Sequence, residues 1–231
     1  MIKIENTEVY GWEAAIRGMR NPMNSWDKSD SFEGCLGLNY WDKPSSCEDC
    51  AEWYGCHGAN SGCVVGENDM QLMKNLSKAG SDHAKFLRMI TVTADITAPL
   101  YWWKEYDTYK VGTVANSCST MHKIHAKEFT LDDFSHEHLG VEEIELLEHI
   151  IRYLNGERRE FINTKDKDYW WHMIQLLPSS YNQRRTVQLN YQVLKNMYFA
   201  RRNHKLDEWQ DFCLWVEQLP YFKEIVIAGD E

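Results

Sequence analysis

The stretch between residues 90 and 97 alternates between apolar and polar residues more regularly than any other part of the chain. Ile90, Val92, Ala94 and Ile96 alternate with threonine and aspartate, and Pro99 closes the run. A period of two residues is typical of a β-strand that buries one face. We therefore expect a strand here, in a fold that contains a sheet.

Apolar residues recur at helical spacing in most of the remaining chain. The clearest stripe runs from Val141 to Leu154, and Asn155-Gly156 is expected to end that helix. Residues 111–119 are small, polar and β-branched, which indicates a loop or a short strand. Further helices are expected near residues 14–20, 68–79, 99–109, 169–177, 186–201 and 206–219. Helices together with a strand predict an α+β fold.

Length and charge limit the classes of function. The 231 residues can bury a full core, and we expect a single domain over residues 1–231. Lys and Arg number 25 against 35 Asp and Glu, and a net charge of −10 argues against nucleic acid as a partner. No apolar run is long enough for a membrane span, and the first residues do not form a signal-peptide core. We expect a cytoplasmic protein without a membrane partner.

Residues 35–66 are rich in Cys, Gly, Ser and Trp and lack periodicity, so an irregular insert is expected there. Its strongest pattern is the spacing of Cys47, Cys50, Cys56 and Cys63. Thiolates at such spacing can converge on one tetrahedral Zn²⁺, which would order a segment with little core of its own. A structural zinc site is the favoured interpretation. An iron–sulfur cluster and a set of unligated cysteines are the alternatives.

A second polar cluster comprises Asn116, Ser117, Cys118 and Ser119, followed by His122. In a helix Cys118 and His122 would face each other, as a nucleophile and its base do. No third group that would orient the base is identifiable. The favoured interpretation is therefore a polar loop that donates hydrogen bonds to an anion.

A third cluster contains Asn190 and Arg201, eleven residues apart. At about 100° per residue this spacing returns to nearly the same helical direction, so both side chains can line one pocket. Asparagine donates and accepts hydrogen bonds, and arginine supplies a planar cation for a phosphate or a pyrimidine carbonyl. An ordinary solvated polar face is the alternative.

These residues, taken in order, resemble the flavin-dependent thymidylate synthases. That family has a Leu-Pro, an Asn twelve residues after the Pro, an Arg eleven residues further on and a downstream Trp, which Pro178, Asn190, Arg201 and Trp209 match. Upstream, the family has a His in a turn, a strand that ends in Ala-Pro and an aromatic helix; this chain has His83, Ala98-Pro99 and such a helix. The resemblance covers residues 68–126 and 168–209 and leaves out the Cys-rich insert.

The resemblance implies a homotetramer that binds FAD and dUMP at subunit interfaces, with helices packed on a small, mostly antiparallel sheet. Methylenetetrahydrofolate would donate the methylene group and NADPH would reduce the flavin, without an enzymic nucleophile. Flavin contacts are implied at His83, Thr108, Tyr109, Lys110, Asn190, Asn196 and Lys205. The nucleotide site is implied at Asn116, Ser117, Cys118, Ser119 and Arg201, which would polarise the pyrimidine.

The chain also departs from the family's pattern. Thr108, Tyr109 and Lys110 stand where the family has its Arg-His-Arg signature. Two further arginines with which the family binds the phosphate are replaced by Thr120 and Ile174. Unless Arg184, Arg185 or Arg202 takes their place, dUMP binding would be severely weakened. Two alternatives follow: a flavin enzyme acting on another pyrimidine, and a non-catalytic nucleotide-binding protein that presents a zinc loop to a partner.

Overall fold

The computed structural model describes residues 2–35 and 61–228. Its contacts group the chain into two compact units, which are described separately below. The first unit comprises Met1–Val9 and Val92–Gln218, and the second comprises Tyr10–Thr91 and Leu219–Glu231. The expected single domain over residues 1–231 stays a prediction.

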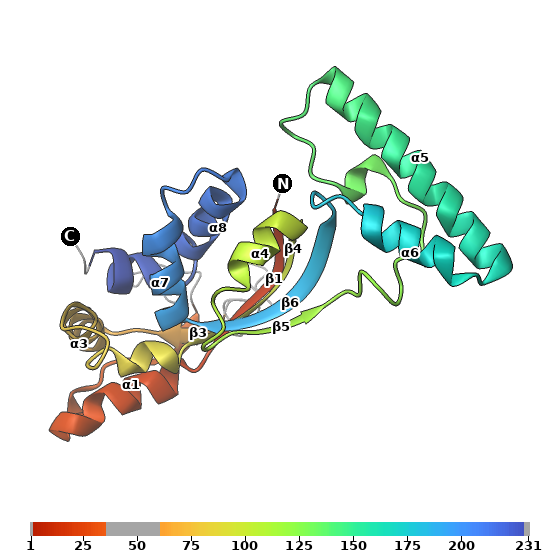
Figure 1. Cartoon of the computed structure of the whole chain (residues 1–231). Coiled ribbons are helices and arrows are strands. Elements are labelled where there is room, and N and C mark those ends of the chain that lie inside the picture. The colour runs from red at the N-terminus through yellow and green to blue at the C-terminus, as the bar shows by residue number, and fades with distance from the viewer. Residues whose placement is uncertain (1, 36–60, 229–231) are drawn as a thin grey trace, which may run out of the picture. The chain divides into compact units, whose positions relative to one another are not determined.

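A four-stranded sheet organises the first unit (Figure 1). Its order is β1 (Lys3–Tyr10), β4 (Thr91–Pro99), β6 (Asn182–Asn190) and β5 (Val114–Ser117). The alternation that predicted a strand is confirmed, because Val92, Ala94 and Ile96 are buried while the residues between them are partly exposed. With β5 antiparallel to β6 and helices beside the sheet, the expected α+β class is also confirmed.

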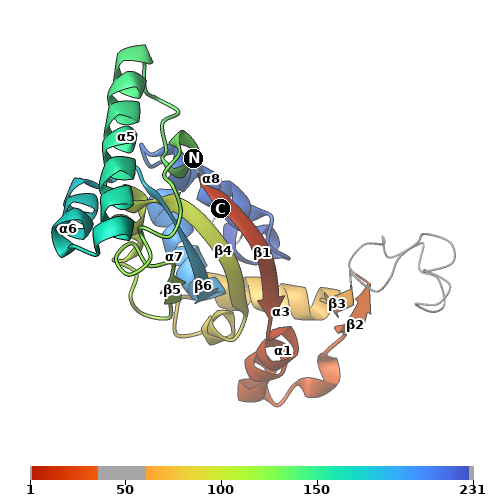
Figure 2. The ribbon, with the colours of Figure 1, turned by 90° about the vertical axis from the view of Figure 1, so that its right-hand side faces the viewer.

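One face of this sheet is covered by α4 (Leu100–Tyr106), α7 (Tyr191–Arg201) and α8 (Asp207–Glu217). Figure 2 shows α7 and α8 behind the strands. Fully buried aromatic rings fill the space between these helices, and Trp102 contacts Trp209 at a ring-centroid distance of 4.8 Å and Phe212 at 5.8 Å. The Nε1–H of Trp103 donates to the carbonyl of Gln183 at 2.9 Å and ties α4 to β6. Much of the aromatic content therefore forms this core.

The expected helix over residues 186–201 is wrong in its first part. Residues Asn182–Asn190 form β6, and only Tyr191–Arg201 is helical. The inward face of β6 contains Gln183 and Arg185 besides Val187 and Leu189, so polar residues hide the alternation on which a strand prediction depends.

A helical hairpin, α5 (Val141–Thr164) and α6 (Lys167–Leu176), follows the short η4 turn (Leu131–Asp133). Asn155-Gly156 was expected to end α5, but the helix continues for eight residues beyond Gly156. The reason is tertiary: Asn155 is buried, and its side chain accepts from Phe129 N at 2.9 Å and donates to Phe129 O at 2.8 Å. Asparagine often ends a helix, but here Asn155 lies inside α5 and binds the loop that precedes the helix.

We expect Asn155→Ala to lower the free energy of unfolding by about 1–3 kcal/mol, because the substitution leaves both backbone groups of Phe129 buried without a partner. Urea unfolding followed by circular dichroism measures the change. The control is Asn163→Ala, at an exposed position of the same helix, where we expect a change within about 0.5 kcal/mol. Equal unfolding midpoints for the two variants would contradict the prediction.

The second unit contains α1 (Trp12–Arg20), α3 (Glu67–Lys78), the η1 (Asn21–Met23), η2 (Trp26–Lys28), η3 (Lys85–Arg88) and η5 (Lys223–Ile227) turns, and a hairpin of β2 (Phe32–Cys35) and β3 (Ser61–Val64). Gly11 begins α1 with φ 90°, and a Cβ there would lie 2.2 Å from the carbonyl oxygen of Met89, so only glycine fits. The hairpin frames residues 36–60, which lie outside the described residues. The two ends of the expected insert 35–66 are therefore joined to each other by the pairing of β2 with β3.

Candidate active site

The C-terminal end of α4 carries a compact polar cluster around Arg201. Arg201 Nη1 donates to Glu105 Oε2 at 2.7 Å, and Arg201 Nε donates to the hydroxyl of Tyr109 at 2.9 Å. Arg201 is the last residue of α7, and Tyr109 lies three residues beyond α4. Two residues that sequence reasoning assigned to a binding site are thus brought into direct contact.

Glu105 is the centre of this cluster. Besides Arg201, its Oε2 accepts from Trp209 Nε1 at 3.0 Å and lies 3.3 Å from His204 Nε2. The Arg201 guanidinium also lies against aromatic rings, 4.8 Å from the centroid of Trp209 and 5.6 Å from that of Tyr109. The Arg201 side chain is 20% exposed, and its Nη2 has no hydrogen-bond partner among the described residues. Two of the three guanidinium nitrogens are thus held by protein groups, and Nη2 keeps two N–H donors for a ligand.

Asn190 lies at the other end of α7. It is the last residue of β6 and the N-cap of the helix, where its Oδ1 accepts from Val193 N at 3.1 Å. Eleven residues of helix rise roughly 16 Å, so Asn190 and Arg201 lie at opposite ends of α7, and the expectation that both line one pocket stays a prediction. The segment after Tyr109 runs along α7 between them, because a Cβ on Gly112 would lie 3.1 Å from Asn190 Nδ2.

A second arginine is bound at the same end of α4. Arg185 Nη1 donates to Asp107 Oδ1 at 2.7 Å, and its guanidinium lies 4.1 Å from the ring centroid of Trp103. Ser117 is the cross-strand partner of Arg185, so both side chains lie on the helix-covered face of the sheet. Asn116 is paired with Thr186 and lies on the opposite face. Asn116 and Ser117, two residues of the expected anion-binding loop, therefore lie on opposite faces of the sheet.

Two backbone amides of the rest of that segment are paired within the loop, and anion binding there stays a prediction. The hydroxyl oxygen of Ser119 accepts from the backbone N–H of Met121 at 3.2 Å and of His122 at 2.8 Å, so these amides are already paired. Cys118 is exposed and lies in non-helical chain, as His122 does, so the helical Cys118–His122 pair is not formed. The nucleophile interpretation loses its geometric basis.

The remaining predicted contacts lie around the cluster or outside it. Lys110 and Lys205 are exposed chain neighbours of the cluster, without a carboxylate partner among the described residues. Thr108 donates to Glu105 O at 2.7 Å, and the side chain of Asn196 accepts from Gln192 at 3.1 Å on the surface of α7. His83 belongs to the second unit, where its N–H donates to the carbonyl of Gly80 at 3.0 Å.

The open face of the sheet holds a separate network around Asp95. Asp95 accepts from Thr186 Oγ1 at 2.5 Å, Asn6 Nδ2 at 2.8 Å and Arg184 Nη2 at 2.7 Å. These hydrogen bonds, from Thr186 first, hold the pKa of the Asp95 carboxyl well below its usual value. Arg184 is committed to this pair and lies on the face opposite to Ser117 and Arg185.

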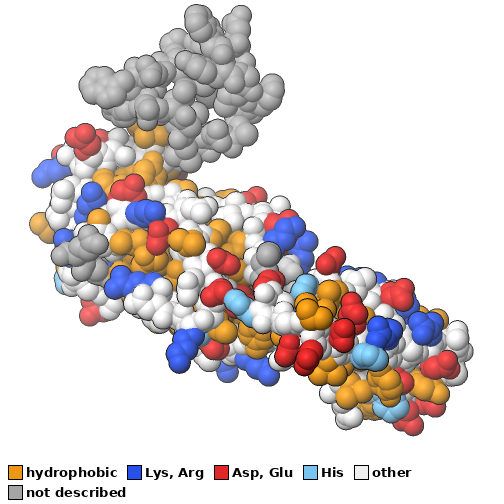
Figure 3. Space-filling model, turned by 90° about the horizontal axis from the view of Figure 1, so that it is seen from above, with side chains coloured by type: hydrophobic (Ala, Val, Ile, Leu, Met, Phe, Trp, Pro, Cys, Tyr) orange, Lys and Arg blue, Asp and Glu red, His pale blue; other side chains and the backbone are white. Residues whose placement is uncertain are grey.

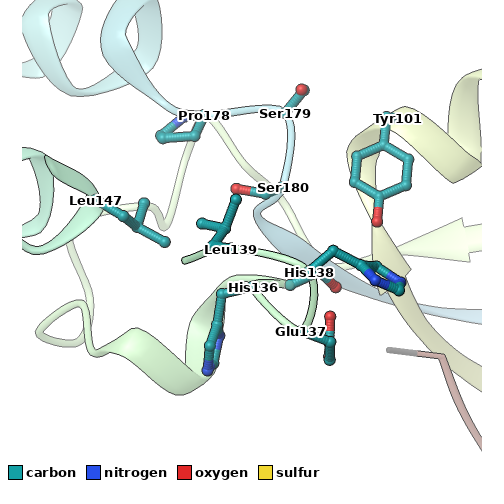
Figure 4. A pocket seen from close by; sticks show the side chains of 10 residues that line it. Tyr101, His136, Glu137, His138, Leu139, Leu147, Pro178, Ser179 and Ser180 are labelled. Carbon is teal, nitrogen blue, oxygen red and sulfur yellow. The ribbon is translucent and has the colours of Figure 1, made fainter. Parts of the chain in front are cut away.

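A cavity of about 290 Å³ opens one helical turn away from the cluster (Figure 4). Tyr101 lines it, four residues before Glu105 on α4, and its hydroxyl donates to Glu208 of α8. Burial and then Glu208 raise the pKa of the Tyr101 phenol above its usual value, so it remains a proton donor. His136 and His138 also line the cavity but point away from each other, so they do not form a shared ligand pair.

The metal prediction falls mostly outside the described residues, since Cys47, Cys50 and Cys56 lie in 36–60. Cys63 is a buried free thiol of β3, and burial raises its pKa to about 11. The described parts of the chain contain no group of three or more His, Cys, Asp or Glu side chains placed to hold a metal ion. Zinc in the insert stays a prediction.

The surface charge and the hydropathy of the helices bear on the expected partners. On the face shown in Figure 3, the described Lys and Arg side chains are interspersed with Asp and Glu and form no continuous basic area. Within residues 2–35 and 61–228, every helix is too short or too polar to cross a bilayer. The expected absence of nucleic-acid and membrane partners stays a prediction.

Comparison with known proteins gives a fold relationship. The structure matches the flavin-dependent thymidylate synthase ThyX from Helicobacter pylori in complex with FAD and dUMP, with a TM-score of 0.62 and 15% identity over 98% of this chain and 99% of that chain. A second structure of that enzyme with FAD and dUMP gives a TM-score of 0.60 and 13% identity over 99% of both chains. No protein-family profile matches the sequence, and no curated protein does. The shared fold is therefore established by structure alone.

Sequence reasoning missed the carboxylates of the site. Glu105 and Asp107 lie 96 and 78 residues from their arginine partners, so no local spacing connects them. The only sequence signal for these two carboxylates was their position just before Thr108, Tyr109 and Lys110, which align with the family's Arg-His-Arg signature.

Proposed function

We propose that this protein is a flavin enzyme that reductively methylates C5 of a uracil ring, with dUMP as the default substrate. The observation that supports it is the Arg201–Tyr109–Glu105 cluster, located in a fold shared over 98% of the chain with an enzyme complexed with FAD and dUMP. Methylenetetrahydrofolate as the methylene donor, NADPH as the reductant, a homotetrameric assembly and a cytoplasmic location belong to the proposal through the resemblance alone.

The residues around the cluster suit FAD. Lys110, Arg202 and Lys205 are chain neighbours of Tyr109 and Arg201, and none has a carboxylate partner among the described residues, so these cations are available to a diphosphate. The guanidinium of Arg202 lies 5.1 Å from the ring centroid of Phe199, and no hydrogen bond joins it to another described side chain. The Tyr109 ring and the polar groups of Asn190 and Asn196 extend this surface along α7.

Arg201 has the main binding role toward the pyrimidine. Its unpaired Nη2 can donate to a ring carbonyl, and the permanent charge stabilises negative charge that develops on that oxygen as C5 reacts. Glu105 and Tyr109 hold the guanidinium in one orientation, which avoids reorganisation during the reaction. When bound, FAD supplies the redox chemistry that carries and reduces the one-carbon unit.

We expect the purified protein to show flavin absorbance near 375 and 450 nm, or to acquire it when FAD is added. It should then release tritium from C5-labelled uracil substrate only when methylenetetrahydrofolate and NADPH are both present. Metal analysis of the same sample measures zinc in parallel. A colourless protein that takes up no FAD would contradict the proposal, and about one zinc per chain in such a sample would favour the non-catalytic interpretation instead.

A flavin enzyme acting on another pyrimidine is the second candidate. The observation that favours it is the pairing of Arg184 and Arg185 with carboxylates, since these are two of the three arginines that could replace the missing phosphate contacts.

A further inference from the structure

Three arginines of the first unit, Arg184, Arg185 and Arg201, are paired with carboxylates of the same chain. Arg201 and Arg185 each lie 2.7 Å from a carboxylate oxygen, of Glu105 and Asp107, at one end of α4. Arg184 is bound to Asp95 on the other face of the sheet. None of them offers an uncompensated charge to a substrate phosphate.

The two family arginines that are missing from the sequence are not replaced in space. Ile174 packs against an apolar cluster that includes Phe129, Leu147 and Met173. Thr120 follows Ser119 in the loop whose amides are already paired. Lys110, Arg202 and Lys205 have no carboxylate partner among the described residues, and the proposed function assigns them to the diphosphate of FAD.

We propose that Glu105 is a specificity-determining residue that adapts this site to an uncharged uracil nucleoside, without a 5′-phosphate monoester. The inference rests on the proposed function and names the substrate class of the same site. Glu105 neutralises the charge of Arg201. The remaining guanidinium nitrogen, Nη2, can donate a hydrogen bond to one neutral carbonyl oxygen.

A phosphate dianion would meet two obstacles at this site. It would be repelled by Glu105 and Asp107, the carboxylates that are paired with Arg201 and Arg185. To take Arg201 for itself it would have to displace Glu105, which also holds the indole N–H of Trp209 and would leave that donor without a partner. A ring carbonyl requires neither change.

Calorimetric titration of FAD-loaded protein with deoxyuridine and with dUMP tests the inference in the wild type and in Glu105→Gln. The glutamine keeps an oxygen acceptor for Arg201 and Trp209 but removes the negative charge. We expect the wild type to bind deoxyuridine at least as tightly as dUMP, and Glu105→Gln to shift the ratio of the two Kd values by about tenfold toward dUMP. The control is Glu148→Gln on α5, an exposed residue 3.9 Å from Arg152, which should leave the ratio unchanged.

The outcomes separate this inference from the proposed function. A wild type that binds dUMP tenfold more tightly than deoxyuridine overturns the inference and leaves the proposed function standing. So does a Glu105→Gln variant that keeps the wild-type melting temperature and the wild-type ratio. If the protein retains FAD but binds neither deoxyuridine nor dUMP, both the inference and the assignment of a uracil substrate are overturned. If the protein does not bind FAD, the proposed function itself is overturned.

Discussion

Replacing Asp69 by asparagine should lower the free energy of unfolding by about 3–5 kcal/mol, the typical cost of leaving one half of a buried ion pair uncompensated. Asp69 is fully buried in α3, and its Oδ1 accepts from Arg20 Nε at 2.6 Å, while Arg20 itself is only 4% exposed. Its Oδ2 accepts from the hydroxyls of Ser29 and Ser31 at 2.7 and 2.6 Å. An amide would place a donor among these donors. Urea unfolding measures the change.

The same carboxylate predicts a pH dependence. Burial alone raises the pKa of Asp69, but hydrogen bonds from Ser31 and Ser29 and the Arg20 guanidinium outweigh it, and the net pKa is lowered. The stabilisation is therefore complete above the unfolded pKa of about 4 and is lost as the pH falls below it. Asp69→Asn should be less sensitive to acid over this range than the wild type.

Glu13→Gln provides the matched control in the same unit. Glu13 pairs with Arg17 at 3.3 Å, but both side chains are more than 60% exposed, so we expect a loss below about 1 kcal/mol. A loss for Asp69→Asn as small as this would show that the buried pair does not anchor the base of the β2–β3 hairpin. The segment from Ser29 to Ser31, directly before β2, would then be held by other contacts.

The contrast between β4 and β6 shows what the sequence could predict about the fold. β4 alternates aliphatic with polar residues, so its buried face is visible in the sequence itself. β6 places Gln183 and Arg185 on its inward face, where Gln183 meets Cys118 O and Arg185 meets Asp107 and the Trp103 ring. These contacts come from segments far away in sequence, and no local pattern reports them.

The same reason limits prediction of the site. Arg201 and Tyr109 were singled out by their positions in a motif pattern, and the structure brings them together. Glu105 was passed over as part of an aromatic helix, although it accepts from Arg201 and Trp209. A carboxylate that pairs with an arginine 96 residues away changes the charge of the site, and that change becomes visible only when the chain is folded.

Arg201→Lys should lower turnover in the C5 tritium-release assay by about 10²–10³-fold, the usual cost of losing one preorganised donor to a developing oxyanion. Lysine keeps the positive charge but lacks the fork that binds Glu105, Tyr109 and a carbonyl oxygen at once. Since Arg201 is assigned to the pyrimidine and not to the flavin, absorbance near 450 nm should remain unchanged.

The matched control for this substitution is Arg184→Lys. Arg184 also lies 2.7 Å from a carboxylate, but on the open face of the sheet and with 48% of its side chain exposed, so turnover should stay within about twofold of the wild type. If the two lysine variants turned over at the same rate with full FAD occupancy, Arg201 would contribute charge alone and not a directed hydrogen bond. The directed hydrogen bond from Arg201 to the ring carbonyl would then have to be abandoned.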